Sequence, residues 1–265
     1  PWGMGRPGWH IECSAMARRH LGDTIDLHCG GVDLVFPHHE NEIAQSECAN
    51  GCTFANYWMH NGFLNIDNHK MSKSLNNFFT VRDVAEQVGY EPIRFFLISG
   101  HYRSPLNYTK EVIESCKASL ERLYTCRNNL DFAMENASGD GKELIAKAEA
   151  AKAKFIDAMD DDLNTADAIA AVFECAREIN TLSASESKES LQAAADMFDS
   201  LTGVLGLLYN RNTDDVPEHV KSLVAERTEV RKAKNWARAD AIRDELASLG
   251  YVVEDTASGP KIVRK

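Results

Sequence analysis

The most informative stretch of this 265-residue chain is Lys70-Met71-Ser72-Lys73-Ser74. Two lysines and two serines on a short segment place compact positive charges and hydroxyl donors where a polyphosphate can bind from one side. A Lys-x-x-Lys pair taken alone is more often a solvated basic loop. The rest of the sequence therefore has to distinguish a phosphate-binding loop from an ordinary surface loop.

Composition restricts the class of protein. Hydrophobic residues make up 44% of the chain and charged residues 26%, as in ordinary globular proteins, and the length allows two or three domains. No apolar run approaches the roughly 18 to 20 residues that span a bilayer, so we expect no membrane partner. The seven cysteines are odd in number and scattered, which argues against a disulfide framework and for a cytoplasmic location.

Charge is distributed unevenly along the chain. The formal net charge of −11 argues against a protein that coats nucleic acid non-specifically. From residue 227 to residue 265, however, nine basic residues face only six acidic ones. An acidic protein with one basic end can bind a nucleic acid at that end.

The first 108 residues predict short strands and loops that alternate with helices. Short apolar runs predict strands at 25–27 and 32–36. Longer patterns predict helices at 11–21 and 40–50. After the lysine stretch, Thr80 followed by Asp83 is typical of a helix start, and Pro92 can open the next helix.

Residues 109–210 predict a helical bundle. Apolar residues recur near the α-helical period of 3.6. The positions on this repeat are Val112, Cys116, Leu120, Leu123, Cys126, Leu130 and Phe132, and later Ala168, Val172, Cys175 and Ile179. A polar segment at 136–141 separates two of the helices. Nothing in this region suggests catalysis.

Residues 217–265 predict a small mixed α/β domain that follows a polar linker closed by Pro217. Its expected elements are two helices and a terminal hairpin: 217–233, 236–248 stopped by Gly250, and 252–253 paired with 261–263 around Ser258-Gly259.

The segment Pro37-His38-His39-Glu40-Asn41-Glu42 could bind a metal ion. His38 and Glu42 are four residues apart and lie on one face of a helix, where imidazole and carboxylate are workable zinc ligands. Cys13 could add a thiolate, and His28 and Cys29 are further candidates between which the spacing does not choose. The structural alternative is a polar first turn of a helix.

A second candidate binding element is Gly30-Gly31-Val32-Asp33. The Asp33 carboxylate can accept hydrogen bonds from a ribose, and the glycines allow a nucleotide to approach the backbone. The sequence contains neither a G-x-G-x-x-G motif nor a P-loop. The segment alone is weak evidence and is also compatible with a simple turn.

Three sequence blocks in this order resemble cysteinyl-tRNA synthetases, which are class I aminoacyl-tRNA synthetases: WGMGRPGWHIECSAM at 2–16, HCGGVDLVFPHHENE at 28–42, and the lysine stretch. The similarity continues into RKAKNWARAD at 231–240. The resemblance implies an α/β partial Rossmann-type catalytic domain at 1–108, an α-helical bundle at 109–210 that binds the tRNA, and a small mixed α/β anticodon-recognition domain at 217–265.

The resemblance also implies roles for single residues. Cys13, His38 and Glu42 would be three of four zinc ligands, and the zinc would bind the substrate thiolate, which the hydroxyl of serine cannot imitate. Further implied positions are Trp9 and His28 in the amino-acid pocket, Gly31 and Asp33 at the ATP site, Lys70 and Lys73 at the phosphates, and Arg231, Trp236, Asp240 and Asp255 at the anticodon. In the implied reaction L-cysteine and ATP, with Mg²⁺, give cysteinyl-adenylate and pyrophosphate, and cysteine is then transferred to tRNA(Cys).

The sequence departs from the family in one respect. It has no His-x-Gly-His signature, and the nearest string is His60-Asn61-Gly62-Phe63. The fourth zinc ligand, a cysteine of the family's N-terminal half, is also not found. We therefore expect a C-terminal portion of an enzyme that is monomeric when intact, and we expect this portion to need the N-terminal segment for adenylation and for zinc binding.

Two other functions remain open at this stage. A ligase of the same ancestry that joins cysteine to an amino sugar would share the zinc and lysine residues but would have no use for 217–265. A noncatalytic tRNA-binding fragment would need only the bundle and the last domain. The presence of Cys13, His38, Glu42 and Lys73 argues against that second alternative.

Overall fold

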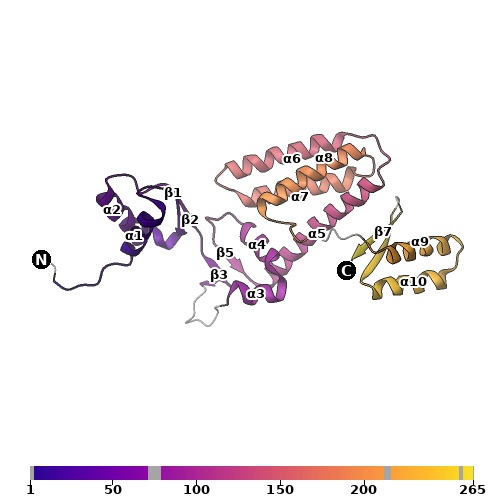
Figure 1. The fold of residues 1–265 in the computed structure, drawn as a ribbon, viewed down its shortest axis with the longest axis horizontal. Helices are drawn as coiled ribbons and strands as arrows, with labels where there is room; N and C mark the ends of the chain where they lie inside the picture. The colour runs from indigo at the N-terminus through magenta and orange to yellow at the C-terminus, as the bar shows by residue number, and fades with distance from the viewer. Residues whose placement is uncertain (1–2, 71–78, 212–215, 257–258, 265) are drawn as a thin grey trace.

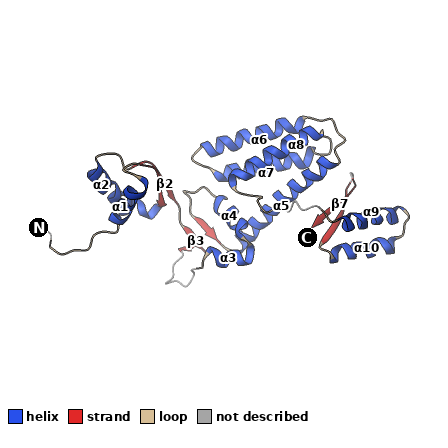
Figure 2. Cartoon of the chain, viewed as in Figure 1, coloured by secondary structure: helices blue, strands red, loops and turns tan. Residues whose placement is uncertain are grey.

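The computed structural model describes residues 3–70, 79–211, 216–256 and 259–264. Figure 1 shows an elongated arrangement in which an N-terminal α/β unit, a helical bundle and a small C-terminal unit follow one another. Helices dominate, and the strands form small sheets (Figure 2). The expected order of a partial α/β domain, a bundle and a small mixed domain is confirmed.

The N-terminal unit is built around a β-α-β element. Its parts are α1 (His10–Leu21), β1 (Ile25–Gly31), α2 (Glu40–Asn50) and β2 (Ala55–Asn61). Strands β1 and β2 are parallel, with Ile25 opposite Ala55, and α2 makes the crossover that a parallel pair requires. Ile25, Phe54 and Ala55 form the small core of this unit.

The expectation of a strand at 32–36 is wrong. These residues lie in two short helical turns, Val32–Leu34 and Val35–His39, that lead from β1 into α2. A five-residue apolar run is too short for its periodicity to separate a strand from a helical turn. The turns place Asp33 just after β1 and His38 just before α2.

A second small sheet supports the lysine stretch. Its strands are β3 (Leu64–Ile66), β4 (His69–Lys70) and β5 (Leu106–Tyr108), in the order β4-β3-β5. Asp67 and Asn68 have left-handed φ values of 47° and 64° and make the tight turn from β3 into β4. The Asn68 N–H donates to Asn107 Oδ1 at 2.7 Å, which ties this turn to β5.

Helices α3 (Val81–Val88) and α4 (Tyr90–Ile98) follow. The predicted helix start is confirmed as a capping box, because Thr80 Oγ1 accepts from the Asp83 N–H at 3.2 Å and the Asp83 carboxylate accepts from the Thr80 N–H at 2.7 Å. Pro92 lies in the first turn of α4, where its missing N–H costs little.

The bundle consists of α5 (Lys110–Glu135), α6 (Glu143–Asp160), α7 (Thr165–Leu182) and α8 (Lys188–Leu205). Its core includes Leu123, Leu130, Leu144, Val172, Ile179, Leu191 and Phe198 and extends to Ile93, Phe95 and Phe96 of α4. The predicted helical repeat is confirmed except at Val112, which is exposed while Ile113 is buried instead, and at Phe132, which is only partly buried and lies outside this core. The bundle and α4 therefore share one core.

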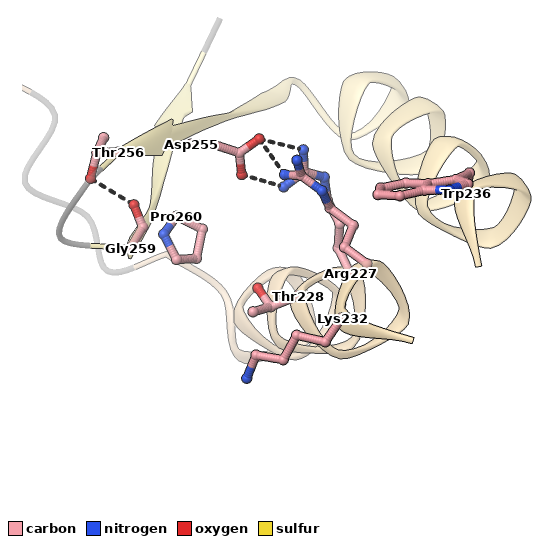
Figure 3. A pocket seen from close by; sticks show the side chains of 9 residues that line it. Arg227, Thr228, Lys232, Trp236, Asp255, Thr256, Gly259 and Pro260 are labelled. Carbon is pink, nitrogen blue, oxygen red and sulfur yellow. Dashed lines mark hydrogen bonds and ion pairs between the residues drawn. The ribbon is translucent and has the colours of Figure 1, made fainter. Parts of the chain in front are cut away.

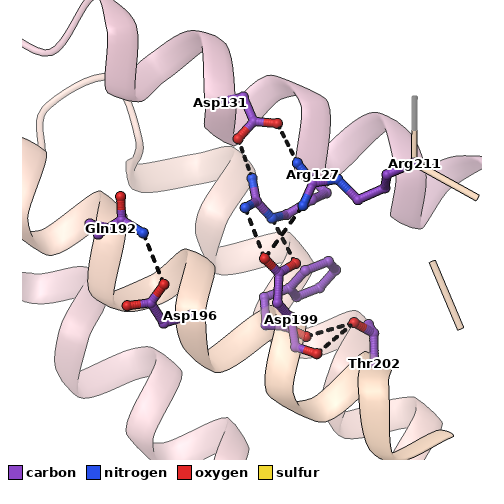
Figure 4. A network of polar contacts seen from close by, with 8 residues as sticks. Arg127, Asp131, Gln192, Asp196, Asp199, Thr202 and Arg211 are labelled. Atoms are coloured by element: carbon purple, nitrogen blue, oxygen red, sulfur yellow. Dashed lines mark hydrogen bonds and ion pairs between the residues drawn. The ribbon is translucent and has the colours of Figure 1, made fainter. Parts of the chain in front are cut away.

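Two polar networks close the end of the bundle. The buried Arg127 of α5 donates to both oxygens of Asp199 of α8, at 2.8 and 2.9 Å, and also pairs with Asp131 (Figure 4). Arg211 donates to Asp131 at 2.6 Å. The network thus connects two helices of the bundle to the chain that leaves it.

The second network centres on Glu91 of α4, which is buried. Glu91 accepts from the Leu208 N–H at 2.5 Å, from the Tyr124 hydroxyl at 2.7 Å and from the Asn210 amide at 3.3 Å. Burial and the bond to Glu91 raise the pKa of Tyr124 well above its usual range. One carboxylate therefore joins α4, α5 and the segment after α8.

The C-terminal unit contains α9 (Glu218–Lys232), α10 (Trp236–Ser248) and the antiparallel strands β6 (Tyr251–Thr256) and β7 (Gly259–Arg264). Its core is formed by Val220, Val224, Ile242 and Leu246. The predicted helices and hairpin are confirmed, although Ser258 lies outside the described residues. Lys261 of β7 hydrogen-bonds Asn129 of α5 and so connects the unit to the bundle. Nowhere in the described ranges is a helix long and apolar enough to cross a membrane.

Candidate functional site

Helices α1 and α2 and strand β1 converge on the buried carboxylate of Glu42. His28 Nε2, on β1, lies 3.0 Å from Glu42 Oε2. His38 Nε2 and His39 Nε2 lie 3.5 and 3.8 Å from the same oxygen. Because Glu42 stands in the first turn of α2, it faces both the preceding histidines and the neighbouring strand.

The donors around Glu42 have the composition of a metal site. Two sets of three have ligand atoms within 4.8 Å of one another: Cys13, His38 and Glu42, and His28, His39 and Glu42. The structure therefore brings together the three residues that the sequence analysis proposed as ligands. The roles of these residues remain predictions.

The other oxygen of Glu42 provides a test of fit. Glu42 Oε1 is buried and has no hydrogen-bond partner among the described residues. A buried carboxylate oxygen without a partner is costly, and a bound cation would relieve that cost. Thiolate, imidazole and carboxylate together suit zinc.

The groups around Cys13 determine what metal binding at this position would require. Burial raises the pKa of the Cys13 thiol, and the neighbouring carboxylates of Glu42 and Glu12 raise it further. The thiol is therefore protonated at neutral pH unless a cation offsets the negative charges. Zinc binding at this position would be accompanied by release of a proton.

The aromatic residues at the start of α1 lie against the cluster. The rings of Trp9 and His38 have centroids 4.0 Å apart. His10 Nδ1 lies 2.9 Å from His38 Nδ1, a contact the sequence analysis missed. The only sequence signal for His10 was its place three residues before Cys13. Trp9 and His28, the proposed pocket residues, thus border the proposed ligands.

The paired glycines at the end of β1 make room for protein groups. A Cβ on Gly30 would lie 2.7 Å from Cε1 of His39, and a Cβ on Gly31 would lie 2.5 Å from Oδ1 of Asp33. His39 Nδ1 in turn lies 2.8 Å from His60 Nε2 of β2. The sequence analysis missed His39 and His60 because their contact joins residues 21 positions apart.

The lysine stretch can be followed only in part. Residues 71–78, and with them Lys73, lie outside the described residues. The backbone of Lys70 is the last position of β4, paired with Asn65. The proposed contacts of Lys70 and Lys73 with ATP therefore stay predictions.

The C-terminal unit contains a cavity of about 350 Å³ between α9, α10 and the hairpin. Its lining residues are Arg227, Thr228, Arg231, Lys232, Trp236, Asp255, Thr256, Gly259 and Pro260 (Figure 3). Arg231, Trp236 and Asp255, three of the proposed anticodon residues, are brought together here. The fourth, Asp240, does not line the cavity, and its carboxylate lies 3.3 Å from Arg243.

The carboxylate of Asp255 in this cavity is fixed by two arginines. Arg227 donates to its two oxygens at 2.9 and 3.1 Å, and Arg231 also donates to it. The hydrogen bonds from Arg227 and then Arg231 lower the pKa of Asp255 to about 2. Arg227 was missed by the sequence analysis, although its position one helical turn before Arg231 was a usable signal.

Three protein families match successive parts of the chain. Residues 1–118 match the tRNA synthetases class I (C) catalytic domain. Residues 154–209 match the DALR domain, and residues 213–260 match the cysteinyl-tRNA ligase anticodon binding domain. The matches follow the order of the three structural units.

Curated relatives match the whole chain. A cysteine–tRNA ligase of Caldicellulosiruptor saccharolyticus is 54% identical over 269 residues, which covers 100% of this chain and 58% of the relative. A cysteine–tRNA ligase of Clostridioides difficile is 48% identical, covering 98% of this chain and 57% of the relative. The chain thus spans a little more than half the length of these relatives.

Solved structures share the fold at low sequence identity. A leucyl synthetase–tRNA complex of Agrobacterium radiobacter K84 gives a TM-score of 0.55 at 19% identity and covers 69% of this chain and 28% of that one. Methionyl-tRNA synthetase of Mycobacterium tuberculosis bound by methionyl-adenylate gives 0.53 at 18% identity, covering 68% and 41%. The fold is therefore that of class I synthetases.

Proposed function

We propose that this chain, which belongs to the cysteinyl-tRNA synthetase family, provides the metal-binding and tRNA-binding parts of an enzyme that attaches L-cysteine to tRNA(Cys) with ATP. The observation that carries the proposal is the Cys13–His38–Glu42 cluster beside Trp9 and His28. It combines a soft thiolate ligand with an imidazole, a carboxylate and the neighbouring ring of Trp9. The family match over 213–260 supports the tRNA part.

Cys13, His38 and Glu42 would hold zinc. When bound, the zinc would take the thiolate of the substrate as a further ligand, so that serine would lose a metal–ligand bond. The hydrogen bond from His28 to Glu42 fixes the carboxylate, and the ring of Trp9 packed on His38 fixes the imidazole. These contacts would hold the ligands in place before the substrate binds.

ATP would bind at the C-terminal end of β1. Asp33 follows this strand and would accept hydrogen bonds from the ribose, while Gly31, the last residue of β1, leaves room for the Asp33 carboxylate. Lys70 and Lys73 would offset the negative charge of the phosphates together with Mg²⁺ while the cysteine carboxylate attacks the α-phosphate. Cysteinyl-adenylate and pyrophosphate would result, followed by transfer of cysteine to the tRNA.

The enzyme proposed here is cytoplasmic, because all seven cysteines are free thiols, as is usual in a reducing compartment. The amino-sugar ligase is the second candidate. The folded cavity of the C-terminal unit, with Arg231 and Trp236 on its wall, favours the tRNA ligase because an amino sugar would leave this unit without a ligand.

The test combines this chain with the segment of a cysteine–tRNA ligase that corresponds to the part of the relatives that the chain does not span. Cysteine-dependent exchange of pyrophosphate into ATP and charging of tRNA(Cys) should appear when the two parts are combined, with serine as the control substrate. Cys13→Ser should abolish the exchange. A combined protein that activates neither amino acid, or activates cysteine without charging tRNA, would contradict the proposal.

A further inference from the structure

We propose that Arg227 is a positioning residue for base recognition in the C-terminal unit. It holds Asp255, and Asp255 in turn holds Arg231, which lines the cavity together with Trp236 and keeps its remaining N–H groups for a ligand. The inference rests on the proposed function, because it takes the ligand of this cavity to be an unpaired RNA base.

Burial separates Arg227 from the residues that can touch a ligand. The side chain of Arg227 is only 10% exposed, whereas those of Arg231 and Asp255 are 38% and 50% exposed. Trp236 is 57% exposed. Arg227 therefore exposes little surface to the cavity that it lines, and it acts on a ligand mainly through Asp255.

The hydrogen bonds give the order of this arrangement. Arg227 donates from both of its terminal nitrogens to the two oxygens of Asp255, at 2.9 and 3.1 Å, which fixes the plane of the carboxylate (Figure 3). Arg231 donates to Asp255 through one nitrogen, Nη1. Its other nitrogens have no hydrogen-bond partner in the described part of the chain and remain available as donors.

Loss of the Arg227 fork would change what Arg231 presents. Both Asp255 oxygens would become available, and Arg231 would be free to turn its own two-nitrogen edge onto them. The Arg231 N–H groups that are now unpaired would then donate to Asp255 instead of to a ligand. Arg227 thus determines how many donors Arg231 offers to a ligand.

The chemistry of the cavity fits an unpaired base. Trp236 offers a ring face for stacking, and the free donors of Arg231 match an acceptor edge such as guanine O6 and N7. Arg227, Arg231 and Lys232 line the cavity with one carboxylate, Asp255, and the ammonium of Lys232 pairs with Glu229 at 2.8 Å. The surplus positive charge suits the adjoining phosphates.

The test uses the whole chain and fluorescently labelled RNA hairpins. One hairpin carries the GCA loop that pairs with cysteine codons, and three others each replace one of these bases. Arg227→Lys keeps the charge and removes the fork. It should weaken the GCA hairpin roughly tenfold and reduce the preference against one of the three replacements. The dependence of affinity on salt should stay unchanged because the charge is retained.

Arg238→Lys is the matched control. Arg238, like Arg227, joins two elements of this unit through a carboxylate: its Nε on α10 donates to Glu226 Oε1 on α9 at 2.8 Å. Unlike Arg227, it does not line the cavity. This variant should keep both the affinity and the base preference. Asp255→Asn provides a second variant of nearly unchanged shape and should lose preference at the same base, and the double variant with Arg227→Lys should lose no more.

The outcomes separate the inference from the proposed function. A wild-type chain that shows no preference for the GCA hairpin would overturn the proposed tRNA recognition, and the inference with it. A wild-type preference that survives in Arg227→Lys would overturn the inference alone. An equal loss of affinity for all four hairpins, with a lowered unfolding temperature, would assign Arg227 a purely structural role and would also overturn it.

Discussion

At the scale of single residues, Glu42 determines most of the proposed metal site. One of its oxygens faces His28, His38 and His39, and the other is buried without a partner among the described residues. No other carboxylate in the cluster could replace it, because both possible ligand sets contain Glu42. Its substitution therefore tests the site more directly than substitution of any one histidine.

We expect Glu42→Gln to lower the zinc affinity of the combined protein by about tenfold or more, because the amide is a neutral and weaker ligand. The measurement is a titration with a competing chelator followed by metal analysis. Glu40→Gln is the control, since Glu40 is exposed on the same helical turn. Equal zinc affinity in the two variants would exclude Glu42 as a ligand.

Asp255 makes a pH-dependent contribution to stability. Arg227 and Arg231 lower its pKa from 3.8 to about 2, so the folded chain favours the charged form. This contribution is present above pH 3.8 and is lost as the pH falls toward 2. Thermal unfolding followed by circular dichroism should show a fall in stability over this range that is smaller in Asp255→Asn. Asp240→Asn, whose carboxylate lies 3.3 Å from Nη1 of the exposed Arg243, should behave as wild type.

At the scale of elements, the end of β1 depends on the absence of a side chain at Gly30. We expect Gly30→Ala to destabilise the N-terminal unit by about 1 to 3 kcal/mol, because the added methyl group would overlap the ring of His39. Chemical denaturation of the whole chain measures the effect. Gly5→Ala is the control, since a Cβ there meets nothing within 4 Å. A fully stable Gly30→Ala variant would show that His39 moves aside without cost.

Local signals explain which elements the sequence could predict. Helix α10 was predicted at its observed bounds, because Asn235 caps its start, accepting from the Arg238 N–H at 3.2 Å, and Gly250 follows its end. Residues 32–36 were mistaken for a strand because this short apolar run carries no helical cap. An element was thus predicted correctly where residues at its ends mark where it starts and stops.

Spacing predicted the candidate sites best where their residues share a short motif, whereas Cys13 was added to the metal site for its residue type. His38 and Glu42 lie on one helical turn, so their spacing revealed them. His39 and Arg227 act through His60 and Asp255, which lie 21 and 28 positions away in the chain. Contacts over such separations depend on how the elements pack, and a single sequence contains no direct record of that packing.

At the scale of the whole molecule, the bundle connects the two candidate sites. Its core continues into α4, which follows the lysine stretch and α3, while Arg211 and Lys261 bind the other end of the chain to α5 and α8. The segment after α8 therefore contacts α4 through Glu91 and contacts α5 and α8 through Arg211. We infer that the bundle and α4 unfold together, because they share buried side chains and not only a surface.

Glu91 tests this coupling. Its carboxylate accepts hydrogen bonds from Leu208, Tyr124 and Asn210, so Glu91→Gln would place an amide donor against three donors. We expect a loss of about 1 to 3 kcal/mol in the unfolding free energy of the bundle, and faster hydrogen exchange in both α4 and 205–210. Glu86→Gln, an exposed change on α3, should leave both unchanged. Faster exchange confined to α4 would mean that the helix opens alone, and the shared core would then not act as one cooperative unit.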